Sequence, residues 1–169
     1  MKFILITLVA VVIGMMVACS SGLSEAQLSY NDGVVSTEQG LYAESIQDFD
    51  KAIQLDPDFA LAYYNRGVSY HYLDQYQNAI EDFDKAIQLD PDYHDAYATR
   101  GVSYHYLDQY QNAIADYTKA IQLDPDYALN YLLRSVSHHI LGNITQADAD
   151  KAKGCSFDRS EDRHFCGAD

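Results

Sequence analysis

The sequence predicts an all-α solenoid built from about four helical hairpins. The main observation is a fifteen-residue stretch, RGVSYHYLDQYQNAI, that occurs at Arg66–Ile80 and again at Arg100–Ile114. A second motif, KAIQLDPD, occurs three times at the same spacing of 34 residues, beginning at Lys51, Lys85 and Lys119. A fixed period of this length is typical of proteins that stack helical hairpins side by side.

Within each period, small and aromatic residues follow the spacing of helix faces. In residues 60–93, small residues stand where two helices must approach closely: Gly67, Ala79 and Ala86. Aromatic residues at helical spacing are expected to fill the space between neighbouring helices: Tyr63, Tyr70, Tyr76 and Phe83. Pro91 disfavours helical geometry at the residue before it, so Asp90-Pro91 marks a boundary, with Asp90 as a candidate N-cap.

These residues resemble the tetratricopeptide repeat, a family of helix-turn-helix repeats. The next period, 94–127, keeps the pattern at Tyr97, Arg100, Gly101, Tyr104, Tyr110, Ala113, Tyr117, Ala120 and Pro125. Arg66 and Arg100 stand where the family usually has leucine, a variation that it tolerates. The resemblance implies a tetratricopeptide α-solenoid wound into a right-handed superhelix.

Two less regular repeats flank this pair, at about 26–59 and 128–154. The first has Ser29 and Ser36 where aromatic residues are expected. The last has charged residues at two positions that a following repeat would have to bury at high cost: Asp148 and Lys151. The array is therefore expected to cover 26–154 and to end in a polar helix. The expected helices are 26–39, 43–55, 60–73, 77–89, 94–107, 111–123, 128–141 and 145–153.

The N-terminal residues have the pattern of a targeting segment. Residues 3–17 are almost wholly apolar, and a helix of this length reaches ~22 Å, short of the ~30 Å hydrocarbon core of a bilayer. This favours a secretory signal peptide over a permanent span or a buried core helix. Met16-Val17-Ala18-Cys19 resembles a bacterial lipobox, which implies cleavage before Cys19 and lipidation of its thiol by groups such as palmitate. Ordinary secretion with cleavage nearby is the alternative.

On this interpretation residues 1–18 are a lipoprotein signal peptide and residues 19–25 a short lipidated tether. Two or more acyl chains anchor a protein stably to a membrane. The protein is then expected in the bacterial cell envelope, facing outside the cytoplasm. The resemblance to lipoproteins implies the outer membrane, if the cell has one, because Ser20 rather than aspartate follows the cysteine.

The family resemblance also implies a ligand groove. In tetratricopeptide arrays the concave surface is lined by the second, fifth, ninth, twelfth and thirteenth residues of each repeat. The peptide-binding residues predicted here are Tyr64, Val68, His71, Tyr72, Asp95, Val102, His105, Tyr106, Val136 and His139, with Leu61, Ala98, Leu129, Leu132 and Ile140 at the remaining positions. Such an apolar and aromatic surface suits an extended or helical peptide. The alternative is that some of these residues cover one another or the preceding hairpin.

One subtype of groove is argued against by the same positions. Family members that capture a C-terminal carboxylate of chaperones use lysine and asparagine at the fifth and ninth positions. Here the residues are Tyr64 and Val68, then Ala98 and Val102. No carboxylate clamp of that kind is therefore expected.

The net charge and the absence of catalytic motifs limit the classes of function that the sequence allows. With 25 acidic and 11 basic residues the net charge is −14, which disfavours nucleic acid and favours a basic or apolar protein partner. No glycine-rich phosphate loop, HExxH or GxSxG motif occurs, and acidic residues in segments such as EDFDK are expected on solvated faces. We therefore expect no enzyme and no cofactor. Helices ~8–10 Å apart do not gather the repeated histidines around one metal, so no metal site is expected.

The C-terminal tail, residues 155–169, contains two cysteines. If Cys19 is lipidated, Cys155 and Cys166 remain as a pair, and outside the cytoplasm they are expected to form a disulfide. Two free thiols, or a cysteine–histidine metal site with His164, are the alternatives.

Taken together, the sequence predicts an envelope-anchored lipoprotein that acts as an interaction scaffold or adaptor. A chaperone-like or sorting receptor for apolar peptides is the second hypothesis.

Overall fold

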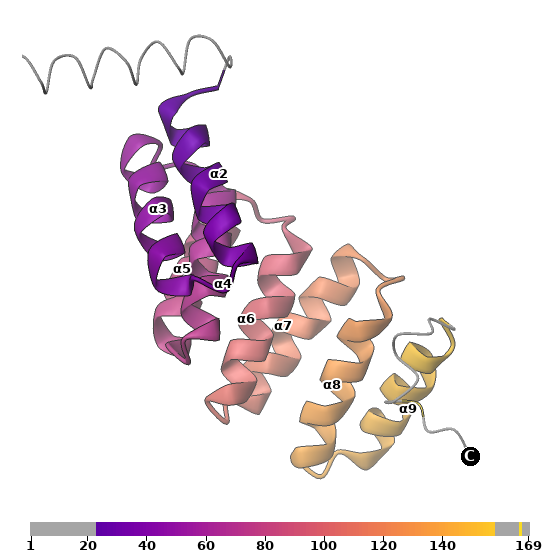
Figure 1. The fold of residues 1–169 in the computed structure, drawn as a ribbon. Coiled ribbons are helices and arrows are strands. Elements are labelled where there is room, and N and C mark those ends of the chain that lie inside the picture. The colour runs from indigo at the N-terminus through magenta and orange to yellow at the C-terminus, as the bar shows by residue number, and fades with distance from the viewer. Residues whose placement is uncertain (1–22, 158–165, 167–169) are drawn as a thin grey trace, which may run out of the picture.

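The computed structural model describes residues 23–157 and Cys166, and their regular structure is entirely helical. Four hairpins follow one another in a row from α2/α3 at one end to α8/α9 at the other (Figure 1). The helices differ by at most two residues at either end from the expected ranges, which confirms the all-α solenoid. They are α2 Glu25–Glu38, α3 Tyr42–Leu55, α4 Ala60–Tyr72, α5 Tyr76–Leu89, α6 His94–Tyr106, α7 Tyr110–Leu123, α8 Ala128–Ile140 and α9 Ile144–Cys155.

Inside the hairpins, a glycine of the first helix faces an aromatic ring of the second. A Cβ placed on Gly67 would lie only 2.8 Å from Cε1 of Phe83, and Phe83 is fully buried. The same pairing joins Gly101 to Tyr117 in the next hairpin. Ala79 and Ala86 are also fully buried, as expected for positions of close helix approach. In these hairpins the core is thus a ring pressed against helix backbone, which requires a residue without a side chain opposite it.

The aromatic residues beside Arg66 are only partly buried, and they pack around its guanidinium group. Tyr63 and Tyr70 are half-buried, and the Arg66 guanidinium carbon lies 5.5 Å and 6.0 Å from their ring centroids. The guanidinium donates to Asp82 through Nε at 2.8 Å and Nη2 at 2.6 Å. Asp82 is only 5% exposed. The expectation that the EDFDK carboxylates lie on a solvated face is therefore wrong for this residue, because it pairs with an arginine sixteen residues earlier.

The same arginine contact recurs and ties consecutive hairpins together. Arg66 Nη1 also donates to Asp50 on α3, so one side chain on α4 joins α3 to α5. Burial by itself lowers the pKa of Arg66, but the hydrogen bonds and charges of Asp82 and Asp50 outweigh it and raise that pKa. Arg100 repeats the pattern with Asp116 and Asp84, and Arg134 with Asp150 and Thr118. These contacts form a regular link between each hairpin and the one before it.

The turns inside the hairpins use left-handed backbone at one position. The residue there is glycine in the first and last hairpins, with φ of 73° at Gly40 and 76° at Gly142. In the two middle hairpins it is aspartate, with φ of 59° at Asp74 and 58° at Asp108. Asp74 Oδ1 accepts a 2.7 Å hydrogen bond from the hydroxyl of Tyr76, the first residue of α5. The aspartate thus positions a tyrosine ring, although its left-handed backbone conformation is less favourable for aspartate than for glycine.

The turns between hairpins differ from the expected N-cap. Asp90 is the C-cap of α5, with φ −133° and ψ 93°, and α6 begins only at His94 after Tyr93. The Asp90 carboxylate accepts a 3.1 Å hydrogen bond from the backbone nitrogen of Asp92. The Asp-Pro-Asp segment is therefore a local turn that ends one helix rather than a cap that starts the next.

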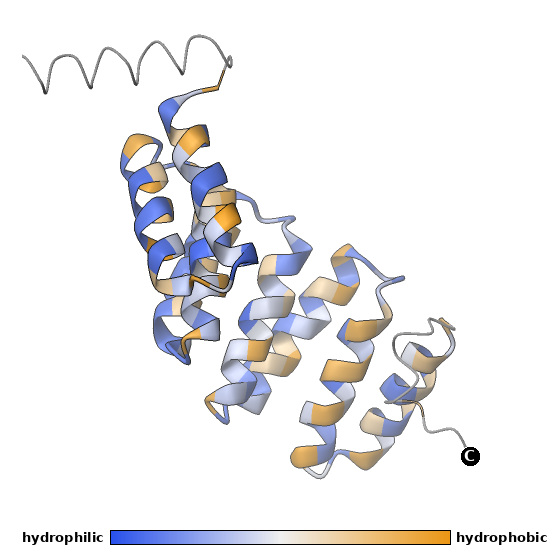
Figure 2. Cartoon of the chain, viewed as in Figure 1, coloured by the Kyte–Doolittle hydropathy of each residue, from blue (hydrophilic) through white to orange (hydrophobic). Residues whose placement is uncertain are grey.

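The array ends in a polar helix, as the repeat pattern predicted. Asp148 and Lys151 are exposed on α9, and Figure 2 shows hydrophilic residues recurring along this helix. Where Ser135 replaces the hairpin glycine, Leu132 of α8 packs against Gly154 of α9 instead. Cys155 is joined to Cys166 by a disulfide. None of the described helices is long and apolar enough to cross a bilayer. The expected signal peptide, residues 1–18, and Cys19 lie outside the described residues.

Candidate peptide-binding groove

The first helices of successive hairpins line one side of the array. Helix α4 contacts both α2 and α6, and α6 contacts α8, whereas the second helices have fewer contacts with one another. The first helices are therefore on the inner side of the curve. This is the side where the family resemblance placed a ligand groove.

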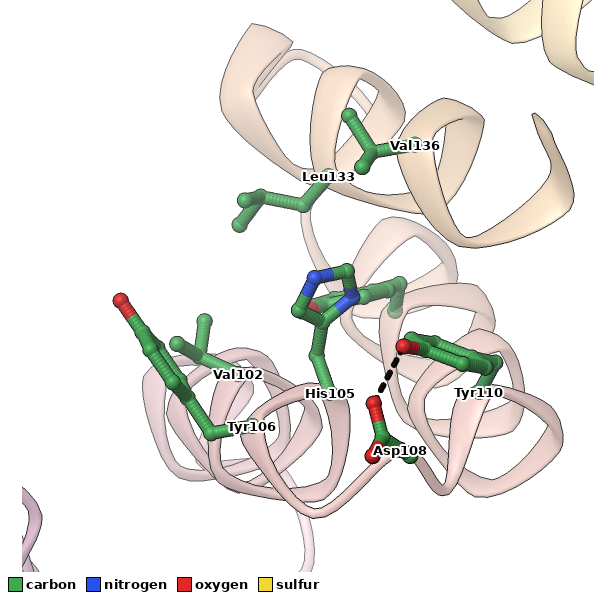
Figure 3. A pocket seen from close by; sticks show the side chains of 8 residues that line it. Val102, His105, Tyr106, Asp108, Tyr110, Leu133 and Val136 are labelled. Atoms are coloured by element: carbon green, nitrogen blue, oxygen red, sulfur yellow. Dashed lines mark hydrogen bonds between the residues drawn. The ribbon is translucent and has the colours of Figure 1, made fainter. Parts of the chain in front are cut away.

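Three pockets follow one another from Tyr64 of α4 to α9; α8 contributes walls to all three, α6 to the first two, and α7 and α9 complete the second and third. The first, of about 170 Å³, includes Tyr64, Asp95, Val102, Asn130 and Leu133. The second, of about 440 Å³, is called here the Tyr110 pocket, and His105 and Tyr110 face Leu133 and Val136 across it (Figure 3). The third, of about 340 Å³, includes Val136, His139, Ile140 and Lys151. Neighbouring pockets share Val102, Leu133 or Val136, so the three form a continuous row.

Most of the predicted groove residues lie in this row. Tyr64, Asp95 and Val102 line the first pocket. Val102, His105, Tyr106 and Val136 line the Tyr110 pocket, and Val136 and His139 line the third. The other three predicted peptide-binding residues of α4 lie outside the three pockets: Val68, His71 and Tyr72. Leu132 is only 1% exposed because it packs onto α9, so most of its surface is withdrawn from the groove.

Tyr64 belongs partly to the packing between hairpins. Its ring lies 5.8 Å from that of Phe83 and 4.8 Å from that of Tyr93, measured between centroids. Its hydroxyl is 3.5 Å from Oγ1 of Thr99 on the next first helix. Burial raises the pKa of the Tyr64 phenol, so this hydroxyl stays protonated and can act as a hydrogen-bond donor. Tyr64 also lines the first pocket.

The repeated histidines make contacts between hairpins. Nδ1 of His71 lies 2.9 Å from Oγ of Ser103, and Nδ1 of His105 lies 3.2 Å from Oγ of Ser137. Burial lowers the pKa of His71, which favours the neutral ring as a hydrogen-bond partner. His139, in the last hairpin, is exposed at the third pocket. Within residues 23–157 and Cys166, no group of three or more histidine, cysteine, aspartate and glutamate side chains is placed to hold a metal ion.

Two tyrosines of the predicted groove stack on rings from the preceding hairpin. Tyr72 lies 4.7 Å from Tyr42 with 9° between the ring planes, and Tyr106 lies 4.9 Å from Tyr76 with 11°. Each nevertheless stays more than half exposed, at 59% for Tyr72 and 57% for Tyr106. One face of each ring therefore packs within the array while the remaining surface is accessible to a ligand. Tyr72 and Tyr106 thus both cover a ring of the preceding hairpin and expose surface to the groove.

One groove residue was not foreseen from the sequence. Asn130 is fully buried, and neither its amide nitrogen nor its amide oxygen has a hydrogen-bond partner among the described residues. It lines the first pocket. In the two preceding repeats the equivalent residues are Ala62 and Ala96, both fully buried. The exchange of a core alanine for asparagine was the available sequence signal.

Comparison with solved structures identifies the same architecture in other proteins. MamA is 24% identical, with a TM-score of 0.78 over 88% of this chain and 86% of that one. The first tetratricopeptide domain of Spaghetti (RPAP3), solved with the HSP90 peptide SRMEEVD, is 25% identical, with a TM-score of 0.68 over 70% of this chain and 96% of that one. The OM64 domain from Arabidopsis is 24% identical, with a TM-score of 0.66 over 68% and 94%.

Family models agree with the repeat boundaries. The tetratricopeptide repeat model matches residues 60–93 and 94–127, and a second model of the same repeat matches residues 33–74. Together they cover more than half of the chain. No curated protein sequence gives a significant match. The regular period, the four hairpins and these matches show that the chain belongs to the tetratricopeptide repeat family, whose fold serves as a scaffold for protein–protein interaction.

Proposed function

We propose that this protein is an envelope-anchored adaptor that holds a peptide segment of a protein partner in its inner groove. The observation that carries the proposal is the continuous row of three pockets that runs from Tyr64 of α4 to α9. Rings and branched aliphatic side chains supply most walls of the Tyr110 pocket, whereas half of the residues that line the third pocket are polar or charged. A row whose middle pocket is mainly apolar and whose end carries polar groups is the kind of surface that accepts an extended peptide segment.

Asn130 supports a peptide as the ligand. Its amide group offers both a donor and an acceptor in a fully buried position at the first pocket. A peptide backbone presents the complementary acceptor and donor. Buried amides normally have partners, so we propose that the first pocket widens when a peptide binds and that the peptide backbone then pairs with this fully buried amide.

The relative solved with an HSP90 peptide supports peptide binding by this fold but not the same ligand. The clamp positions hold Tyr64 and Val68 in one repeat and Ala98 and Val102 in the next. A peptide ending in acidic residues would also meet a chain with a net charge of −14. We therefore propose a basic or apolar segment.

The groove assignment predicts that replacing Tyr72 and Tyr106 together by alanine abolishes capture of the partner. The measurement is affinity capture from membranes crosslinked in the cell, with the bound proteins identified by mass spectrometry. Tyr63 and Tyr97 provide the matched control, because they lie on the same two helices but beside Arg66 and Arg100. Their replacement by alanine should leave capture unchanged. Unchanged capture by the Tyr72 and Tyr106 double variant would refute the groove assignment.

The same capture separates adaptor from chaperone-like receptor. One partner at a fixed ratio supports the adaptor. A broad set of unfolded proteins supports a receptor for apolar peptides, which the mainly apolar lining of the Tyr110 pocket would also suit.

The anchor is proposed from the lipobox, Met16 to Cys19, and is tested separately. A Cys19→Ala variant is expected to lose acylation, because the thiol that would carry the acyl chains is gone. The measurement is metabolic labelling with a palmitate analogue, with immunoblotting to compare the size of the variant with that of the unaltered chain. A Cys19→Ala protein that still takes up the palmitate analogue would contradict lipidation at this residue.

A further inference from the structure

The tyrosine stacks between hairpins form a series with one missing member. The first residue of each second helix stacks on the last residue of the next first helix, in Tyr42–Tyr72 at 4.7 Å and Tyr76–Tyr106 at 4.9 Å. The third pair of this series would join Tyr110 to residue 140. That residue is Ile140, which has no ring and is 47% exposed. Beside Tyr110 the structure has instead the pocket of about 440 Å³.

The framework around the missing ring is the same as around the filled one. In the filled case Tyr106 packs edge-on to His71 at 5.4 Å, and His71 lies 5.2 Å from Tyr76. In the open case His105 lies 5.2 Å from Tyr110, again edge-on. The hydroxyl of Tyr110 donates to Asp108, as that of Tyr76 donates to Asp74 (Figure 3).

Both histidines are held in the same way from the next hairpin. Ser103 lies 2.9 Å from Nδ1 of His71, and Ser137 lies 3.2 Å from Nδ1 of His105. The two sites therefore share their ring, their histidine, their aspartate and their serine. They differ in the tyrosine that covers them, which is present over Tyr76 and replaced over Tyr110.

We propose that the Tyr110 pocket takes an aromatic side chain from the bound peptide, stacked on Tyr110 and packed against the edge of His105. The protein's own Tyr106 shows the geometry that such a ring adopts. Val102, Leu133 and Val136 supply apolar walls, and the pocket shares residues with its neighbours on both sides. A side chain that enters it can therefore belong to a peptide that continues along the groove.

This inference rests on the proposed peptide-binding function and adds the chemistry of one anchor residue. Offset stacked rings are favoured beyond the area that they bury, by an amount equivalent to up to about tenfold in affinity. An aliphatic side chain of similar size fills the same space without that contribution. The pocket should therefore prefer tyrosine or phenylalanine over leucine by about tenfold.

The test uses the full chain in detergent and two blocked tripeptides, Gly-Tyr-Gly and Gly-Leu-Gly. Binding is followed by methyl nuclear magnetic resonance at Val102, Leu133 and Val136. We expect the tyrosine peptide to shift these signals at millimolar concentration and to bind about tenfold more tightly than the leucine peptide. Equal binding of the two peptides, or binding of neither, would overturn the proposal.

A tyrosine placed at position 140 is expected to occupy the Tyr110 pocket in place of the peptide side chain. Ile140→Tyr is expected to stack on Tyr110 and to weaken the tyrosine peptide at least tenfold, while Ile140→Leu, the matched control, binds as the unaltered chain does. An Ile140→Tyr protein that binds normally would contradict the proposed stack. Concentration-dependent signal changes without peptide would instead indicate a second copy in the pocket and would also overturn it.

The outcomes separate this inference from the proposed function. Capture of a partner that depends on Tyr72 and Tyr106, with no preference for the aromatic tripeptide, would leave the adaptor function standing and remove only the aromatic anchor. Selective binding of the tyrosine tripeptide without capture of any partner would support an aromatic site at the Tyr110 pocket and remove the adaptor function.

Discussion

Replacing Arg100 by alanine is expected to lower the free energy of unfolding by about 3–5 kcal/mol. Arg100 donates to Asp116 through two nitrogens, at 2.8 and 2.6 Å, and Asp116 is only 5% exposed. Among the described residues, Asp116 has no other hydrogen-bond partner. Burial already raises the pKa of Asp116 against the opposing hydrogen bond and charge of Arg100. Without the arginine, the buried Asp116 carboxylate has no compensating charge. It then either stays ionised at a high desolvation cost or binds a proton, and both destabilise the folded state.

The measurement is urea denaturation followed by circular dichroism, and the matched control is Asp116→Ala. In that variant Arg100 keeps its contact with Asp84 and is itself more accessible to water, so the loss should be only about 1–2 kcal/mol. The double variant Arg100→Leu with Asp116→Leu removes both charges and should recover much of the stability, because apolar residues often replace a buried ion pair at little cost. Equal losses in the two single variants would contradict the assigned asymmetry.

Replacing Phe83 by alanine is the second large effect, with an expected loss of about 3–5 kcal/mol. The ring is fully buried and touches the backbone side of α4 at Gly67, so its removal leaves a cavity that two packed helices cannot close. The measurement is again chemical denaturation.

Lys151 is the control for this variant, because it occupies the same repeat position in the last hairpin and is exposed. Lys151→Ala should change the stability by no more than about 0.5 kcal/mol. Gly67→Ala tests the contact from the other side. It should destabilise the protein even though alanine favours a helix by about 1 kcal/mol, and the loss should shrink when Phe83 is also alanine. Additive effects of Gly67→Ala and Phe83→Ala would show that the two positions do not touch.

The period of 34 residues was enough to predict the helices, because each repeat carries its own small residues, rings and turn. Contacts inside one hairpin, such as Gly67 with Phe83, follow from that pattern. The role of Asp82 did not follow, because EDFDK reads as a solvated segment unless Arg66 on the other helix is placed beside it. The arginine that replaces the usual leucine was the signal, and its sixteen-residue spacing to aspartate recurs at Arg100 and Arg134.

The groove positions were predicted from the family pattern, but their contacts depend on how consecutive hairpins are stacked. The sequence does not show that Tyr72 stacks on Tyr42 or that His71 contacts Ser103, because each of these contacts joins two different repeats. The same applies to the Tyr110 pocket, because its lining residues come from two consecutive hairpins and meet only in the packed array. Asn130 was missed for a different reason, since a single asparagine at a core position looks like any other irregularity of the last repeat.

Photo-crosslinking from the groove tests the adaptor function at the level of single residues. A benzophenone amino acid placed at Tyr106, on the inner helix α6, is compared with one at Gln88, which is exposed on α5. The proposed function predicts a covalent adduct with the captured partner from position 106 and none from position 88. Adducts from position 88 alone, or equally from both positions, would show that the partner does not lie in the groove.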